Sequence, residues 1–263
     1  MAKLNSNGRM IEYSDTGGDG LPVILAHGYF LDGEMFSEQA RALPPQFRVI
    51  TWDARGHGGT ADDGEPFTYW DSARDLLGLM DALGIDRAVC GGVSQGGFIS
   101  LRAALLAPQR MAGLVLFDTE AQACSPDDQQ GYRQLFSALA AAGPADELVI
   151  PLARQIIGDH PAAAWWIGKW RAAKQLPVGA PAECLITRDD IVARLAEITC
   201  PVLLARGSMD SSLPASRLDT LHEHLPAATP VHSIDGAWHS PPITHPEAVN
   251  PLLLGFLSGL ALR

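Results

Sequence analysis

Short apolar runs alternate with helical patterns along the first half of the chain, and this alternation constrains the fold more than any other feature. The apolar runs lack regular polar positions, which is typical of strands buried on both faces. The segments between them carry apolar residues at helical spacing. Such a pattern predicts a parallel sheet with helices on both faces. We expect strands over residues 21–26, 47–52, 88–93 and 111–117, and helices over residues 33–43, 68–83 and 95–107.

The alternation stops after residue 119 and resumes at residue 200. The segment between has no convincing strand pattern and is rich in Ala, Leu, Gln and Trp. We therefore expect a mostly helical insertion over residues 120–199, and a core domain formed by residues 1–119 and 200–263. In the last part, we expect strands over residues 201–205 and 231–234 and helices over residues 214–225 and 246–262.

The composition excludes several classes of protein. Hydrophobic residues make up 47% of the chain and charged residues 19%, which excludes intrinsic disorder. The net charge is -11 and Lys and Arg are scattered, so we expect neither nucleic-acid binding nor attachment to anionic membranes. No stretch reaches the ~18 apolar residues of a membrane helix. The N-terminus has no apolar signal core, and we expect a cytoplasmic protein.

The cysteines do not indicate a metal site. None of the four forms a CxxC pair or lies near a histidine at zinc spacing. Free thiols suit a reducing compartment. We therefore predict no structural metal. The four residues are Cys90, Cys124, Cys184 and Cys200.

The strongest chemical signal is G-x-S-x-G centred on Ser94, between an expected strand and an expected helix. At such a junction the chain turns so sharply that the serine is held in strained geometry with its hydroxyl exposed. Side chains at Gly92 and Gly96 would clash with the turn. The pattern predicts that Ser94 is a nucleophile.

A serine nucleophile needs a base, and an acid to orient that base. Among eight histidines we select His239, because it follows an expected strand in a loop before the last helix. The acid is predicted to be Asp210, in the turn after residues 201–205. Asp118 is the alternative, since it directly follows the strand before the insertion.

Two backbone amides are predicted to stabilise the oxyanion that forms when a serine attacks a carbonyl group. One is the amide of Gln95, directly after the nucleophile. The other is the amide of Tyr29, in the turn after residues 21–26. The Gln95 side chain is an additional candidate donor to a substrate. We expect His27 to be a buried residue that holds the Tyr29 turn.

These motifs resemble the α/β-hydrolase fold superfamily, in its branch of small serine esterases and lactonases. The resemblance also rests on His27-Gly28-Tyr29 and on residues 53–58 (DARGHG), and it covers about two-thirds of the chain. It implies an eight-stranded, mostly parallel sheet with a helical cap after strand six, which assigns the insertion to the cap. It supports the chain order Ser94, Asp210, His239 and gives His57 a structural role. The polar Gln95 departs from the Met or Leu that often follows the nucleophile.

Three aromatic residues are candidates for the substrate pocket. Phe30 and Trp238 flank the predicted catalytic turns, and Trp166 lies in the insertion, where it shares a helix face with Trp170. Each could line an apolar acyl or aryl site. The alternative for each is core packing.

We expect a serine hydrolase without cofactor or metal, acting on a small carboxylic ester. A lactonase or enol-lactonase, or a hydrolase of C–C bonds in vinylogous diketones, would use the same residues, and peracid formation could be a side activity. The rival from another class is a small-molecule receptor on the same fold. The expected partner is a small ester or lactone, and the oligomeric state is not indicated.

Overall fold

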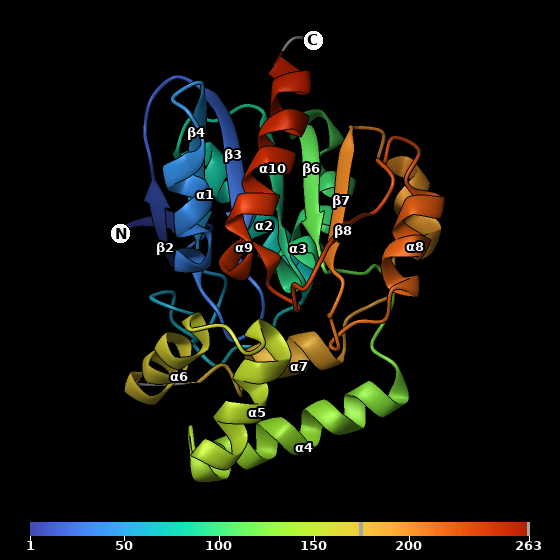
Figure 1. Cartoon of the computed structure of the whole chain (residues 1–263). Coiled ribbons are helices and arrows are strands. Elements are labelled where there is room, and N and C mark those ends of the chain that lie inside the picture. Colours follow the sequence, from blue (N-terminus) through green and yellow to red (C-terminus); the bar gives the residue numbers. More distant parts are fainter. Residues whose placement is uncertain (174–175, 262–263) are drawn as a thin grey trace.

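Eight strands form one sheet in the computed structural model, which describes residues 1–173 and 176–261 (Figure 1). Their order is β1-β2-β4-β3-β5-β6-β7-β8. Strand β2 is antiparallel to both neighbours, and the other pairs are parallel. The predicted eight-stranded, mostly parallel sheet is therefore confirmed. The strands are β1 (Ala2–Ser6), β2 (Arg9–Asp15), β3 (Leu21–Ala26), β4 (Phe47–Trp52), β5 (Ala88–Val93), β6 (Met111–Phe117), β7 (Val202–Gly207) and β8 (His232–Ile234).

Helices cover both faces of the sheet (Figure 1). On one face α2 and α3 pack together, and on the other α1 packs against α10. The segment predicted as one helix over residues 33–43 is a 3-10 turn, η1, followed by α1, because the Asp32 side chain caps a first tight turn at Glu34. The bounds are η1 (Gly33–Phe36), α1 (Ser37–Ala42), α2 (Tyr69–Ala82), α3 (Gln95–Leu106), η2 (Pro108–Arg110), α8 (Ser216–His224), α9 (Pro241–Thr244) and α10 (Pro246–Ala261).

Five helices lie between β6 and β7 in the described part of the chain. They are α4 (Pro126–Ala142), α5 (Asp146–Ile157), α6 (Ala162–Ala172), α7 (Ala180–Ile186) and the 3-10 helix η3 (Val192–Glu197). Figure 1 shows α4 to α7 below the sheet, whereas η3 packs against α8 and α3. No strand occurs between β6 and β7 in the described part of this segment. We call α4 to α7 the cap. Among the described residues, no helix combines the length and apolarity needed to cross a membrane.

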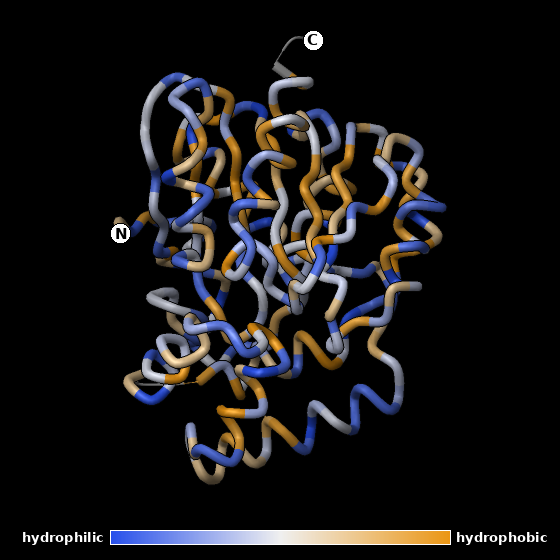
Figure 2. The backbone as a smooth tube through the Cα atoms, in the orientation of Figure 1, coloured by the Kyte–Doolittle hydropathy of each residue, from blue (hydrophilic) through white to orange (hydrophobic). Residues whose placement is uncertain are grey.

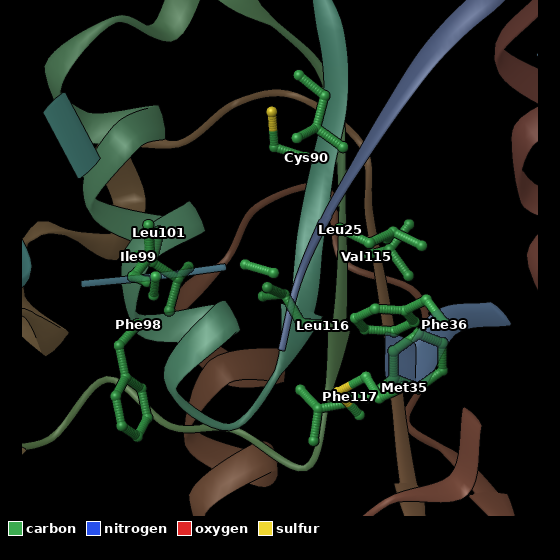
Figure 3. Packing of buried hydrophobic residues seen from close by; sticks show 14 of the residues in the cluster. Leu25, Met35, Phe36, Cys90, Phe98, Ile99, Leu101, Val115, Leu116 and Phe117 are labelled. Atoms are coloured by element: carbon green, nitrogen blue, oxygen red, sulfur yellow. The ribbon is translucent and has the colours of Figure 1, made fainter. Parts of the chain in front are cut away.

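The apolar core follows the central strands. Figure 2 shows hydrophobic residues concentrated along them. Figure 3 shows Ile99 and Leu101 of α3 on one side of the strands and Met35 and Phe36 on the other. All four side chains are buried. The two-sided covering explains why these strands read as continuous apolar runs.

Strands β1 and β2, at one end of the sheet, were not individually predicted. Most of their residues are exposed or half-buried, and several are polar. Strand β2 is nevertheless held by β4, with Tyr13 opposite Trp52. Because β1 and β2 are only partly covered, they do not form the apolar runs that reveal the central strands.

Candidate active site

Ser94 occupies a sharp turn between β5 and α3. Its backbone angles are φ 52° and ψ −113°, which a residue with a side chain rarely adopts. A Cβ atom added to Gly92 or to Gly96 would lie 1.9 Å from the carbonyl oxygen of Ala26. The turn therefore requires glycine on both sides of Ser94. The fold holds the turn closed by hydrogen bonds from the Ser94 amide to the Phe117 carbonyl (3.0 Å) and from Thr119 Oγ1 to the Ser94 carbonyl (2.7 Å).

Unusual backbone conformations gather around this turn. Four described residues other than glycine have positive φ, and three of them lie in the turns after β3, β5 and β6. They are Phe30 (φ 66°), Ser94 and Asp118 (φ 43°); the fourth, Asn7, lies in the β1–β2 turn. Strained backbone that the fold maintains at one place is typical of a functional site. The carboxyl ends of parallel strands are where open α/β sheets bind their ligands.

His239 and Asp210 meet at the same edge of the sheet. Asp210 lies in the turn after β7, and His239 lies in the loop between β8 and α9. His239 Nδ1 is 2.9 Å from Asp210 Oδ2, and the two side chains are 8% and 1% exposed. Although burial raises the pKa of the Asp210 carboxyl, the charge of His239 and the hydrogen bonds that Asp210 receives lower it below its usual value. Asp210 is thus an ionised partner for the His239 imidazole.

Asp118 lies next to Asp210 rather than replacing it. Its side chain is fully buried, and Oδ1 accepts a hydrogen bond from the Gly207 amide (2.8 Å). Burial, followed by the charge of Asp210, raises the pKa of Asp118 well above its usual value. Among the described residues, Asp118, Asp210 and His239 are the one group of three whose side-chain atoms could together hold a metal, within 4.8 Å of one another. Two of these residues, His239 and Asp210, are hydrogen-bonded directly to each other.

The two predicted oxyanion amides are free to bind a ligand. Within the described part of the chain, neither the Tyr29 amide nor the Gln95 amide donates a hydrogen bond. Gln95 is the first residue of α3, where backbone amides have no partner inside the helix. Unpaired amides at a helix N-terminus favour negative charge.

The Gln95 side chain points into the protein and not toward a ligand. It is 2% exposed, and its Nε2 lies 3.3 Å from His27 Nδ1 and 3.4 Å from His57 Nε2. Its Oε1 accepts a weak hydrogen bond from Tyr69 (3.4 Å). This placement assigns the side chain to a buried polar network and leaves only the amide for the site.

His27 and His57 are structural residues. His27 Nδ1 bonds the Gly28 carbonyl (2.8 Å), and its Nε2 accepts from the Ala54 amide (3.0 Å). Burial lowers the pKa of His27 to about 4 and, together with the nearby His27, that of His57 to about 3. Both rings are therefore neutral at pH 7, and they join the loops after β3 and β4.

A pocket between the sheet edge and the cap contains Ser94 and His239 together. Its empty volume is about 650 Å³, including the part open to solvent. No hydrogen bond joins Ser94 to His239 among the described residues, as is common in unliganded enzymes whose catalytic bonds tighten on binding. The lining is mostly apolar, and the residues are Gly28, Tyr29, Phe30, Leu31, Ser94, Phe98, Glu120, Tyr132, Leu135, Leu152, Gln155, Ile156, Leu185, Ser212, Leu213 and His239.

Two ion pairs of one carboxylate at the pocket were not predicted from the sequence. Glu120 lines the pocket, and its Oε1 lies 2.5 Å from Nη2 of Arg188, with both side chains nearly fully buried. Arg217 Nε is 3.1 Å from the other Glu120 oxygen. The only sequence signal was the position of Glu120 just after a strand, because Arg188 lies in a segment without a recognisable motif.

The three aromatic candidates have different positions. Phe30 lines the pocket, whereas Trp166 and Trp238 are absent from its lining. Trp166 lines a separate cavity on the side of α6, and Trp238 packs against Gly158 at the end of α5. The neighbour Trp170 donates a hydrogen bond to the Phe30 carbonyl (2.7 Å), which fastens the cap to the core. Both tryptophans of the shared helix face are thus used in packing.

Comparisons with known proteins agree over nearly the whole chain. A family model described as alpha/beta hydrolase fold matches residues 22–157. The non-heme chloroperoxidase of Streptomyces lividans is 29% identical and covers 96% of this chain and 97% of its own length. For 3-oxoadipate enol-lactonase 1 of Acinetobacter baylyi the identity is 25%, with 97% and 96% covered. The structure of a thermophilic esterase from Thermogutta terrifontis is similar with a TM-score of 0.89 and 28% identity, covering 98% of both chains.

Proposed function

The chain belongs to the alpha/beta hydrolase family, and from this premise we propose that it is a serine hydrolase that cleaves a small carboxylic ester. The observation that carries the proposal is the hydrogen bond between His239 and Asp210 at a pocket that also holds the strained Ser94. The similarity to the Thermogutta terrifontis esterase supports the same reaction class.

In the first half of the proposed reaction, Ser94 Oγ attacks the ester carbonyl carbon and His239 Nε2 takes the hydroxyl proton. Asp210 holds the opposite ring nitrogen, Nδ1, and stabilises the imidazolium that forms. The carbonyl oxygen becomes an oxyanion, which accepts hydrogen bonds from the Tyr29 and Gln95 amides. His239 then returns its proton to the alcohol oxygen as the C–O bond breaks, leaving an acyl group on Ser94.

In the second half, a water molecule attacks the acyl carbon while His239 takes one of its protons. The same two amides stabilise the second oxyanion. The bond to Ser94 Oγ then breaks, Ser94 recovers its proton from His239, and the carboxylic acid leaves. This cycle uses side chains and backbone amides only, so we propose that it needs neither a metal nor a cofactor.

The pocket favours a small, mainly apolar substrate. A mostly apolar lining with a few polar groups is typical of small-molecule sites. Phe98, Leu135, Leu152 and Ile156 supply apolar walls, three of them from the cap side. The chain carries a net charge of -11, which disfavours multiply charged anionic substrates at a distance.

A lactone is the second candidate substrate. The observation that favours it is the nearly full-length similarity to 3-oxoadipate enol-lactonase 1. A lactone is an internal ester, so the steps are unchanged, except that the alcohol product stays attached to the acyl group. In the same cycle, hydrogen peroxide in place of water would give a peracid.

The experiment is stopped-flow hydrolysis of p-nitrophenyl esters from acetate to octanoate, with an aliphatic lactone measured by acid release. We expect multiple turnovers with an optimum among the short acyl chains. Ser94→Ala removes the nucleophile and should abolish turnover while circular dichroism stays unchanged. Ser137→Ala is the matched control, because Ser137 is exposed on α4 and does not line the pocket.

Each other outcome has a defined meaning. Turnover retained by Ser94→Ala would contradict the nucleophile assignment. Lactone hydrolysis without ester hydrolysis would favour the second substrate. A single stoichiometric burst without turnover, on every substrate, would instead favour a receptor that binds a small molecule at this site.

A further inference from the structure

Asp118 occupies a central place that the proposed reaction cycle leaves without a role. It directly follows β6, whose last residue pairs with Ala205 of β7. The Asp118 amide donates to the Ala205 carbonyl (3.0 Å), and the Gly207 amide donates to Asp118 Oδ1 (2.8 Å). The positive φ of 43° is one that aspartate tolerates better than most residues. The fold thus holds this carboxyl group between the strand that precedes Ser94 and the strand that precedes Asp210.

The surroundings of Asp118 do not suit a second negative charge. Its Oδ2 is buried and has no hydrogen-bond donor among the described residues. One oxygen of Asp118, one oxygen of Asp210 and one nitrogen of His239 all lie within 4.8 Å of one another. The positive charge of Arg206 lowers the pKa of Asp118, but Arg206 forms no ion pair with Asp118 in the described part of the chain. Two adjacent buried carboxylates cannot both remain ionised at low cost.

The distribution of donors decides which carboxyl group holds the proton. Asp210 accepts from His239 Nδ1 (2.9 Å) and from the amides of Ser212 (2.7 Å) and Leu213 (3.3 Å). Asp118 accepts one hydrogen bond, from Gly207. Donors stabilise the ionised form of a carboxyl group, so the charge belongs on Asp210. Burial and the Asp210 charge raise the pKa of Asp118, in agreement with a proton on Asp118.

We propose that Asp118 is a neutral carboxylic acid that donates a hydrogen bond to the Asp210 carboxylate and thereby positions the acid of the triad. The proposal deepens the proposed function, since it assumes that Asp210 orients a catalytic His239. Asp118 is a positioning residue: it transfers no proton during turnover and does not line the pocket. Its hydrogen bond restrains the Asp210 carboxylate and withdraws part of its charge, which limits how strongly Asp210 stabilises protonated His239.

Two substitutions separate the donor from the shape. Asp118→Asn retains one group that accepts from Gly207 and one that donates to Asp210. Asp118→Leu keeps a branched side chain at this position but has no donor, and leucine is somewhat larger than aspartate. For Asp118→Asn we expect kcat/KM within about twofold of wild type and an unchanged pH profile. For Asp118→Leu we expect kcat/KM to fall about tenfold, and the acidic limb of the profile to move up by about one pH unit, because Asp210 then stabilises protonated His239 more strongly.

Two kinetic outcomes would overturn the proposal. If Asp118→Asn loses activity and shifts the acidic limb as Asp118→Leu does, the carboxyl group acts in some way other than as a neutral donor. If Asp118→Leu folds and leaves the limb in place, Asp118 has a purely structural role. The shift of the limb is the informative readout, because a packing defect alone would lower activity without moving it.

Infrared spectroscopy tests the protonation state without turnover. The wild-type protein at pH 7 should show the C=O band of a protonated buried carboxyl group, and Asp118→Asn should lack it. Asp219→Asn is the matched control, because Asp219 is exposed on α8 and its substitution should leave the band in place. Absence of the band from the wild type would overturn the proposal even if Asp118→Leu fails to fold. Failure to find a substrate would contradict the proposed function but leave this measurement intact.

Discussion

His239 Nδ1 lies 2.9 Å from Asp210 Oδ2, although the two residues belong to loops after different strands. This hydrogen bond fixes which ring nitrogen carries the proton and leaves Nε2 free to act as the base of the proposed reaction. We expect Asp210→Asn to lower kcat about 10⁴-fold, because an amide can hold the imidazole in the wrong tautomer. The measurement is kcat on the best p-nitrophenyl ester. Asp118→Asn, the matched change one strand away, should remain near wild type, and the reverse result would move the orienting acid to Asp118.

The stability of the protein should report the buried proton on Asp118. The pKa of Asp118 is raised in the fold, so folding retains a proton that the unfolded chain releases above pH ~4. That contribution is fully present below pH ~4 and is lost as pH rises toward the folded pKa, by about 1.4 kcal/mol per pH unit. Asp118→Asn does not titrate. The free energy of unfolding of Asp118→Asn should therefore rise relative to that of wild type from pH 5 to pH 7.

Urea unfolding of wild type and Asp118→Asn at pH 5, 6 and 7 measures this gain. Asp219→Asn should show no comparable trend, since Asp219 is exposed. A difference between wild type and Asp118→Asn that stays constant across this range would show that Asp118 is ionised in the fold.

The two buried histidines should act on stability in the opposite direction. Burial lowers the pKa of His27 to about 4, and burial with the nearby His27 lowers that of His57 to about 3. The unfolded chain takes up protons below pH ~6.5, so each histidine destabilises the fold by about 1.4 kcal/mol per pH unit as pH falls. The stability that the neutral His27 ring contributes is lost as pH falls from about 6.5 to about 4. For His57 the loss continues down to about pH 3.

His57→Gln isolates one of these contributions. Compared with wild type at each pH, this variant should become relatively more stable as pH falls from 6 to 4, whatever its offset at pH 7. Urea unfolding at pH 4, 5, 6 and 7 provides the comparison. The same difference at all four values would mean that the pKa of His57 is the same in the folded and unfolded protein.

The glycine after the nucleophile turn should not accept a methyl group. A Cβ atom on Gly96 would lie 1.9 Å from the Ala26 carbonyl oxygen, which is backbone and cannot rotate away. We expect Gly96→Ala to lower the free energy of unfolding by about 1–3 kcal/mol and to lower kcat, since the turn that holds Ser94 must shift. Gly255→Ala is the control on α10, where nothing lies within 4 Å, and it should stabilise by about 1 kcal/mol. Equal stability of the two variants would contradict the close approach at Gly96.

The sequence predicted the elements whose signal is local. The central strands are continuous apolar runs because helices cover both their faces, and the glycines around Ser94 are required by contacts inside one turn. Strands β1 and β2, at one end of the sheet, lack such a signal, since part of their surface is exposed. The Gln95 side chain also lay beyond prediction, because its partners His27 and His57 come from two other loops.

By itself, the sequence determined the central strands and their order along the chain, the sharp turn at Ser94 and the candidates His239 and Asp210. Only the tertiary structure decided how the remaining residues divide between pocket and packing: Phe30 lines the pocket, whereas Trp166 and Trp238 do not. It also decided the relation of Asp118 to Asp210, which the sequence presented as alternatives and the fold made neighbours. The physical reason is that chain pattern encodes which residues are buried and where turns occur. Which side chains meet depends on how loops from separate strands come together at one edge of the sheet.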